Sequence, residues 1–551
     1  MGILADILPI LLTIGGVILV HELGHFLVAR WMGIYVVEFS IGFGPRLFVF
    51  KGKKTHPHLP PTEYAIALLP VGGFVKMLGY DPGDPVPDEA KDVAFGQKPI
   101  WRRFLAVAAG PAFNLILPLI LFFAVSLTVS KVDGNVVADV IDGYPAAAAG
   151  IRAGDRITEI DGEKIEYWWQ IQAALQPRYE QPTHIAWIDV TGQPKEATLT
   201  PALEERVYIP DVITKKVGII GLTGSYALPI VGVTTGSAAA AAGIAPWDRV
   251  VAVDGTPVTR VKQMLTLLTS HADRDVRVSF IHYDAAVVRP FGVDAGTVKD
   301  VTLPAAVNDP ARGLVASACV VWRTVPGSPA ERIGLKPGDE IVSLGDHSCD
   351  SWMTFADSQK GKGPMKLVVK RDGVVLAPMA LEVVRMPWPN DFDKTAKEWI
   401  HGIVTQFDVA ADEKVDNDDR LAFALYNTSH GFGESIEQTL KMLGGLFAGK
   451  VSIGEGLGGP VDIGRMAVRA AEQGWDQLLR LIGAISISIG LVNLLPIPIL
   501  DGGQILFLAL EGIRRRPVSL RTRMIAVYTS LAFVVVLMVL VIRNGVAKFA
   551  G

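Results

Sequence analysis

Residues 7–29 read ILPILLTIGGVILVHELGHFLVA and carry three ionisable side chains, His21, Glu22 and His25, in an otherwise apolar run. A run of this length can cross a bilayer as a helix, because about 20 apolar residues are enough. It has neither a basic leader nor a small-residue cleavage site, so we interpret it as a retained span rather than a signal peptide. Ionisable side chains at membrane depth are costly unless they are paired or bound to a metal, so these three are predicted to be functional.

The spacing of the two histidines is typical of a zinc site. Residues four apart lie on nearly the same face of a helix, so the imidazoles of His21 and His25 can reach one Zn²⁺. Glu22 would then lie beside the metal, where it can act as the general base of a hydrolytic reaction. The alternative is a histidine pair that a neighbouring helix satisfies without a metal.

A catalytic zinc site needs a third protein ligand and an open fourth position. Residues 493–503 read NLLPIPILDGG and place Asp501 in another apolar run, which Pro496 and Pro498 interrupt. Prolines break the hydrogen-bond ladder of a helix, which is tolerated at membrane depth only where protein or a water-filled cavity satisfies the freed groups. Asp501 is therefore the candidate third ligand, in a place that water can reach.

The composition indicates a membrane protein with several domains. The chain has 551 residues, 50% of them hydrophobic, and a mean hydropathy of +0.35. One hydrophobic core rarely grows beyond roughly 250–300 residues. Apolar residues gather near both ends and leave a long middle of ordinary composition. The net charge of −4 is small for this length and gives no sign of a nucleic-acid partner.

Four runs are long and apolar enough to be transmembrane helices, namely residues 7–29, 104–129, 478–510 and 524–542. Lysines and arginines, such as Lys53 and Arg515, are concentrated between the first and second runs and between the third and fourth. Because cytoplasmic loops carry the excess of basic residues, both segments are expected to be cytoplasmic. Residues 131–477 are then expected on the opposite side of the membrane.

The middle of the chain contains a repeat. Its copies read GIRAGDRI at 150–157, GIAPWDRV at 243–250 and GLKPGDEI at 334–341, and they begin about ninety residues apart. Each copy follows a segment of small residues and leads into an alternating apolar run that is typical of a strand. The pattern resembles the PDZ domain, a β-rich fold that captures peptides by strand addition. It predicts three such domains, at 131–222, 223–312 and 313–388.

The role of the three copies has two interpretations. They could capture peptides, or they could pack beside the membrane and limit access by size. Trp247 stands where the other copies have Gly154 and Gly338, which makes the second copy the poorest candidate for capture.

The pattern changes again at residues 389–477. Helices are expected over 394–403 and 435–447, and a glycine-rich loop over 449–464. Such amphipathic helices could lie along the membrane surface or serve as packing struts.

Two motifs together resemble the site-2 protease family of intramembrane zinc metalloproteases. They are His-Glu-x-x-His in the first span and Asn-x-x-Pro-x-Pro-x-x-Asp-Gly near the end, and the order of spans, loop and repeats looks like the bacterial RseP branch of the family. The resemblance covers nearly the whole chain, although the branch usually carries two PDZ repeats rather than three. It implies a bacterial inner-membrane protein with a cytoplasmic membrane-associated β-hairpin region. Together with the four apolar runs and the three repeats, it leads us to expect four transmembrane helices and three periplasmic PDZ-like domains.

The resemblance also implies roles for single residues. The implied ligands of Zn²⁺ are His21, His25 and Asp501, and the implied general base is Glu22. The implied contacts of the substrate backbone are Asn493, Gly72 and Gly73. The two glycines lie in a β-hairpin whose strand edge could pair with an unwound substrate. Small residues of the second span, among them Gly110, would let helices approach closely.

The implied activity is an endopeptidase that cuts single-pass membrane proteins within the bilayer. The implied substrates are anti-sigma factors already trimmed by another protease, and remnant signal peptides. Two other classes remain: a zinc protease with its metal at the membrane surface, or a non-enzymatic membrane-anchored PDZ scaffold. The first usually takes its third ligand from a downstream Glu, which Asp501 in a broken span argues against. The intact set of metal ligands argues against the second.

The two cysteines, Cys319 and Cys349, fit neither a Cys-based zinc site nor a disulfide-rich framework. They flank the third repeat, on the side of the membrane where disulfides persist. The sequence leaves open whether their sulfur atoms meet.

Overall fold

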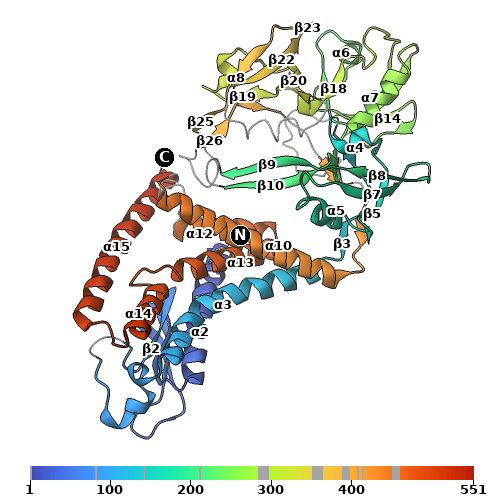
Figure 1. Cartoon of the computed structure of the whole chain (residues 1–551). Helices are drawn as coiled ribbons and strands as arrows, with labels where there is room; N and C mark the ends of the chain where they lie inside the picture. The colour runs from blue at the N-terminus through green and yellow to red at the C-terminus, as the bar shows by residue number, and fades with distance from the viewer. Residues whose placement is uncertain are drawn as a thin grey trace.

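The computed structural model of the chain divides into a helical part and a β-rich part, which Figure 1 shows at opposite ends of the molecule. It describes residues 3–80, 84–141, 143–209, 213–282, 297–345, 347–349, 364–387, 397–405, 409–411, 414–449 and 460–550.

The helical part is built around α3 (Ile100–Leu127). This helix packs against α2 (Gly16–Trp31), α10 (Arg420–Phe447), α13 (Trp475–Asn493) and α14 (Asp501–Arg514). Small residues make the contacts close. A Cβ atom at Gly24 of α2 would stand 2.5 Å from the carbonyl oxygen of Ala109, and one at Gly483 of α13 would overlap the ring of Phe122. The glycines therefore let the neighbouring helices approach the backbone and side chains of α3.

Three helices of the described residues are long and apolar enough to cross a membrane: Ile7–Trp31, Ile100–Leu127 and Trp475–Asn493. They correspond to the first three predicted spans. The first joins the end of α1 (Ile3–Ile10), the π-helical η1 (Leu11–Gly15) and α2. The third predicted span is split, because α13 ends before the prolines and α14 begins at Asp501. The fourth, residues 524–542, lies in α15 (Leu520–Ala550), which is not one of the three.

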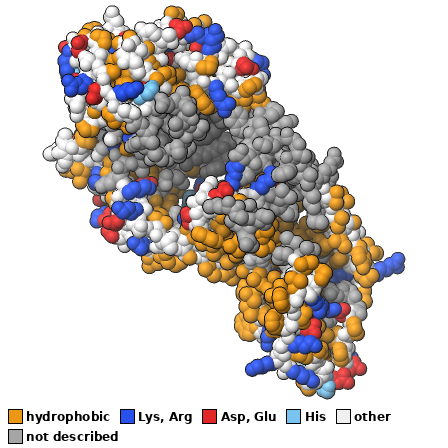
Figure 2. All heavy atoms as spheres, turned by 180° about the vertical axis from the view of Figure 1, so that it is seen from behind, with side chains coloured by type: hydrophobic (Ala, Val, Ile, Leu, Met, Phe, Trp, Pro, Cys, Tyr) orange, Lys and Arg blue, Asp and Glu red, His pale blue; other side chains and the backbone are white. Residues whose placement is uncertain are grey.

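The surface of the helical part is apolar. Leu12, Leu27, Phe104 and Ile120 are among its exposed large hydrophobic side chains. Figure 2 shows hydrophobic side chains gathered over this part of the molecule, between the β-rich part and a more charged far end. Contact with water would make such a continuous apolar surface unfavourable, whereas lipid removes that cost. The structure is therefore that of a membrane protein with β-rich domains outside the bilayer.

The loop between the first two spans folds into a curled sheet of β1 (Val36–Lys51) and β2 (Glu63–Met77). Residues 38–41 of β1 pair on one side with residues 73–76 of β2 and on the other with residues 63–66. Within the described residues, no strand pairs with the other side of residues 73–76. The predicted hairpin therefore presents a strand edge, and β2 packs against α2.

The β-rich part contains three sheets with the same strand order, each with its own hydrophobic core. The first sheet is β6-β5-β7-β8, the second β15-β14-β16-β17 and the third β21-β20-β22-β23, with β24 also beside β22. The central strands are β5 (Arg156–Ile160) and β7 (Thr183–Ile188), β14 (Arg249–Val253) and β16 (Val276–His282), and β20 (Glu340–Leu344) and β22 (Met365–Arg371). The outer strands are β6 (Glu163–Lys164), β8 (Pro194–Leu199), β15 (Thr256–Pro257), β17 (Thr297–Leu303), β21 (His347–Ser348), β23 (Val374–Val375) and β24 (Met379–Leu381). The repeat in the sequence is thus a structural repeat.

The aspartate of each repeat holds a turn. Asp155, Asp248 and Asp339 are each 1% exposed, and each accepts a hydrogen bond from the backbone N–H three residues earlier. The recurring glycine–aspartate pattern therefore stabilises the fold of each domain. Trp247 has a φ of +76°, in the left-handed region that favours the glycine found in the other two copies.

The predicted borders of the second and third domains fall too early. β18 (Leu314–Ala316) pairs with β13 (Val231–Val233) of the second domain, and β27 (Ile403–Val404) pairs with β19 (Arg323–Thr324) of the third. The pairing of β11 (Leu222–Thr223) with β4 (Asp139–Val140) closes the first domain in the same way. Borders at 312 and 388 separate each domain from the strand that closes it.

The prediction of a helix over 394–403 is wrong for residues 397–403, which the structure describes. β26 (Lys397–Ile400) pairs with β25 (Val384–Pro387), because pairing with another strand outweighs a weak local preference for helix. β28 (Val409–Ala411) and β29 (Lys414–Asp416) then return to β12 (Ser225–Ala227) and β3 (Lys131–Asp133). The chain therefore comes back beside the end of α3, where Asn417 donates a hydrogen bond to the carbonyl of Val129.

Two helices follow this return. The helix predicted over 435–447 is the second half of α10, which begins at Arg420. The expected loop over 449–464 ends in α12 (Pro460–Gln473), and its residues 450–459 lie outside the described part.

Cys319 and Cys349 form a disulfide, with their Cα atoms 5.7 Å apart. Cys319 belongs to the hydrophobic core of the second β-rich domain, and Cys349 packs against the cores of both the second and the third. The bridge therefore links these two domains.

Replacing both cysteines by alanine should lower the thermal stability of the β-rich part. The bridged residues are 30 apart in the sequence, and closing a loop of that size lowers the entropy of the unfolded chain, which stabilises the folded state by about 3.6 kcal/mol. Differential scanning fluorimetry of the full-length protein in detergent measures the effect. Wild-type protein in reductant should have the same melting temperature as the variant. A reductant that frees both thiols, as thiol labelling shows, without changing the melting temperature would contradict this role.

Candidate metal centre

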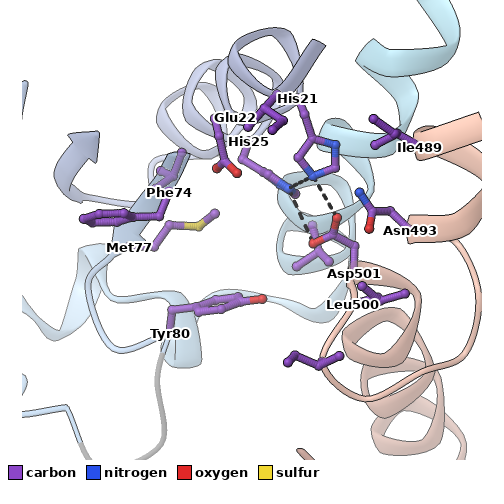
Figure 3. Close-up of a pocket in the computed structure, with 14 residues that line it drawn as sticks. His21, Glu22, His25, Phe74, Met77, Tyr80, Ile489, Asn493, Leu500 and Asp501 are labelled. Atoms are coloured by element: carbon purple, nitrogen blue, oxygen red, sulfur yellow. Dashed lines mark hydrogen bonds and ion pairs between the residues drawn. The ribbon is translucent and has the colours of Figure 1, made fainter. Parts of the chain in front are cut away.

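The two histidines of the first span lie on one face of α2, directed toward the centre of the helical part. His21 and His25 are each 7% exposed, and their Nε2 atoms lie 3.2 Å apart. Figure 3 shows both rings pointing to the same place, with Glu22 directed into the cavity beside them. The helical spacing of four residues produces this convergence.

The third member of the cluster comes from the other end of the chain. Asp501 is the first residue of α14, and its carboxylate oxygens lie 3.1 Å from Nε2 of His21 and 3.4 Å from Nε2 of His25. The glycines that follow make this position possible. A Cβ atom at Gly502 would overlap the carbonyl oxygen of Leu495, and one at Gly503 would overlap that of Ile497. The glycine pair therefore lets α14 start directly against the turn that breaks the helix.

The chemistry of this cluster fits zinc. Two imidazole nitrogens and one carboxylate oxygen lie within 4.8 Å of one another, the group of donors that catalytic zinc sites use. Ligands about 2.0–2.1 Å from a tetrahedral zinc stand about 3.3 Å from each other. The Nε2 atoms of the two histidines are 3.2 Å apart, and each lies close to a different carboxylate oxygen of Asp501, His21 at 3.1 Å from Oδ2 and His25 at 3.4 Å from Oδ1. Three protein ligands leave a fourth position open for water or substrate.

Helix α3 packs against the rings of both histidines. A Cβ atom at Gly110 would overlap Nε2 of His25 and would stand 2.8 Å from Cε1 of His21. Only glycine leaves room there for both rings, as the small residues of the second span predicted. The Nδ1 atom of His25 also lies 2.9 Å from the carbonyl oxygen of Ala106, to which it can donate a hydrogen bond.

A cavity of about 410 Å³ opens in front of the cluster. Besides His21, Glu22, His25 and Asp501, it is lined by Ile18, Phe74, Val75, Met77, Tyr80, Val107, Ile489, Asn493, Ile499 and Leu500. Asn493, the last residue of α13, thus reaches the cavity, and Figure 3 shows its side chain next to Asp501.

The two glycines of the hairpin lie near this cavity without lining it. A Cβ atom at Gly73 would stand 3.1 Å from Cγ of Glu22, so this glycine leaves space for the side chain of Glu22. A Cβ atom at Gly72 would overlap the ring of Phe43. The residues of β2 that do line the cavity are Phe74, Val75 and Met77, which sequence reasoning did not single out.

Tyr80 was also missed, because it follows the hairpin and belongs to no motif. Its ring projects into the cavity in Figure 3. The contact of Ala106 with His25 gave no signal in the sequence either, since it uses a backbone carbonyl.

Comparison with known proteins identifies the family of the chain. The sequence pattern of Peptidase family M50 matches residues 9–537. The protease RseP of Yersinia pestis is 26% identical over 100% of both chains. The regulator of sigma-E protease RseP of Escherichia coli (strain K12) is also 26% identical over 100% of both chains.

The family match includes both parts of the metal cluster, His21 and His25 near one end and Asp501 near the other. It also covers nearly all of the first of the three helices that are long and apolar enough to cross a membrane, and the whole of the other two. The chain therefore belongs to Peptidase family M50, the site-2 proteases, and is a zinc-dependent intramembrane protease.

Proposed function

We propose that this protease hydrolyses peptide bonds in the transmembrane segments of single-pass membrane proteins, at a zinc site held by His21, His25 and Asp501. The observation that carries the proposal is the convergence of these three side chains in a cavity between apolar, membrane-spanning helices. A site at the membrane surface would not be surrounded by such helices, and a scaffold without activity would not need the ligand set.

The chain's own residues divide the chemistry between them. Zinc, when bound, acts as a Lewis acid that makes water more acidic and polarises a peptide carbonyl. Glu22 lines the cavity beside the ligands, where its carboxylate can take a proton from the attacking water and deliver it to the departing amine. Gly73 supports this role because it leaves the space that the Glu22 side chain occupies.

The substrate backbone would bind along the edge of β2. Residues 73–76 pair with β1 on one side, and Phe74, Val75 and Met77 line the cavity. An unwound substrate can add to this edge as a further strand, with Gly72 and Gly73 at its beginning. Asn493 faces the same cavity, and its side-chain amide can hold a substrate peptide group.

The substrate class follows from these constraints and from the relatives. A membrane-buried cavity accepts a transmembrane helix only after local unwinding, which favours single-pass proteins with short external domains. A relative over the full length is a regulator of sigma-E protease. We therefore extend to this chain the substrates expected from its sequence, which are trimmed anti-sigma factors and remnant signal peptides.

The orientation in the bacterial inner membrane is part of the proposal. Met524, Ile525, Phe533 and Val536 of α15 are exposed large hydrophobic residues, as expected of a fourth span in contact with lipid. The hairpin sheet and the arginines before α15 would face the cytoplasm, which puts the active site toward that side. The three β-rich domains, as PDZ-like domains, would be periplasmic, where a disulfide is stable. Their size would restrict the approach of substrates with large folded ectodomains.

The Glu22→Gln variant should lose cleavage and keep its zinc. The amide cannot accept the proton, whereas the three ligands are unchanged, so we expect a loss of at least about 100-fold in rate. Cleavage of a trimmed single-pass substrate in detergent, together with zinc analysis by mass spectrometry, tests both parts. Cleavage close to the wild-type rate would assign the base to another residue.

The Asp501→Ala variant should lose both zinc and activity, because two imidazoles alone hold the metal weakly. Asp476→Ala is the matched control, an exposed aspartate in the first turn of α13 that takes no part in the cluster. Zinc content after dialysis should be near the wild-type value for the control and close to zero for Asp501→Ala. Full occupancy in Asp501→Ala would place the third ligand elsewhere.

Single cysteines at exposed positions should report the orientation. Both native cysteines are bridged, so added thiols are labelled selectively. In intact spheroplasts, a membrane-impermeant maleimide should label Glu163→Cys of the first β-rich domain and leave Lys53→Cys and Arg515→Cys unlabelled. Inverted membrane vesicles should give the opposite result. Labelling of Lys53→Cys in spheroplasts would reverse the proposed topology.

A further inference from the structure

One buried amide in α3 lies against a metal-binding histidine. Asn114 is 0% exposed, and the nitrogen of its side-chain amide lies 3.2 Å from Nδ1 of His21. Its amide oxygen is buried and has no hydrogen-bond partner in the part of the chain that the structure describes. A fully buried polar group next to a ligand calls for a role in the site.

An imidazole that binds a metal through Nε2 carries its proton on Nδ1, and this N–H group needs a hydrogen-bond acceptor. The Nε2 atom of His21 faces Asp501 and His25, so it is the nitrogen that would hold the metal. The proton of the neutral ring is then on Nδ1, which becomes a donor and needs an acceptor. His25 already has one in the carbonyl oxygen of Ala106. For His21, the atom in reach belongs to Asn114, and a half-turn of the amide brings its oxygen to that position.

We propose that Asn114 is a positioning residue of the zinc site, whose amide oxygen accepts the Nδ1 proton of His21 and holds Nε2 toward the metal. The inference rests on the proposed role of His21 as a zinc ligand. Partners of this kind fix the tautomer and the ring orientation of metal-bound histidines. Both histidines would then be oriented by α3, one through a backbone carbonyl and the other through a side chain.

The surroundings of Asn114 hold it in place. Ser486 of α13 donates a hydrogen bond of 2.8 Å to the backbone carbonyl of Asn114. A Cβ atom at Gly490 would stand 3.2 Å from Cβ of Asn114, so α13 packs directly on this residue. Because Asn114 is completely covered, its amide keeps a fixed position beside the ring of His21.

The test compares variants of the full-length protein in detergent by their zinc affinity, measured by competition with a fluorescent chelator. Asn114→Leu keeps the size of the side chain and removes the acceptor, so zinc should bind about 10- to 100-fold more weakly. Asn114→Asp keeps an acceptor and should restore most of the affinity. Ser486→Ala is the matched packing control, since it loses the contact between α13 and α3 and leaves the amide in place.

A spectroscopic measurement separates positioning from packing. With Co²⁺ in place of zinc, the visible absorption of Asn114→Leu should differ from wild type, while Asn114→Asp and Ser486→Ala should resemble it. Equal zinc affinity in Asn114→Leu and wild type would overturn the inference, as would equal weakening in all three variants. If zinc stays bound in Asp501→Ala or fails to bind wild type, the proposed ligand set itself fails, and the role of Asn114 fails with it.

Discussion

The contact of two histidines with one carboxylate at membrane depth is the constraint on which the helical part depends. None of these groups can be buried alone in an apolar environment without a large cost in free energy. His21 and His25 come from the first span and Asp501 comes from the other end of the chain, so the two ends must meet. Four glycines make this meeting possible. Gly24 and Gly110 bring α3 up to α2, and Gly502 and Gly503 bring α14 up to the broken turn.

The sequence reveals those parts of the site whose geometry is local. His21, Glu22 and His25 lie within about one helical turn, and the prolines before Asp501 mark a break that protein or a water-filled cavity must satisfy. The first three spans follow from hydropathy because lipid imposes the same requirement along the whole helix. The sequence points to the two hairpin glycines, but not to what their missing side chains leave room for. Gly73 makes room for Glu22, a residue far away in the sequence.

In the β-rich part, the pairing of strands far apart in the sequence could not be predicted. Repeats identified three domains, yet the strand that closes each one follows its repeat, and its partner lies some eighty residues earlier. No local pattern encodes that pairing. The same holds for β28 and β29, which return past whole domains to β12 and β3. Strand pairing over such distances depends on side-chain packing between the partners, so residues 397–400 could be mistaken for a helix.

The proposed function requires that a transmembrane helix of the substrate unwinds within the bilayer. In lipid, each unpaired peptide group costs several kcal/mol, so a transmembrane helix opens only where other groups replace its hydrogen bonds. This chain offers such groups on both sides of the metal ligands. One side is the edge of residues 73–76, and the other is the turn between α13 and α14 with Asn493 at its start. In the proposed function, hydrolysis and unwinding take place together, because His21, His25 and Asp501 line the same cavity as residues of β2 and Asn493.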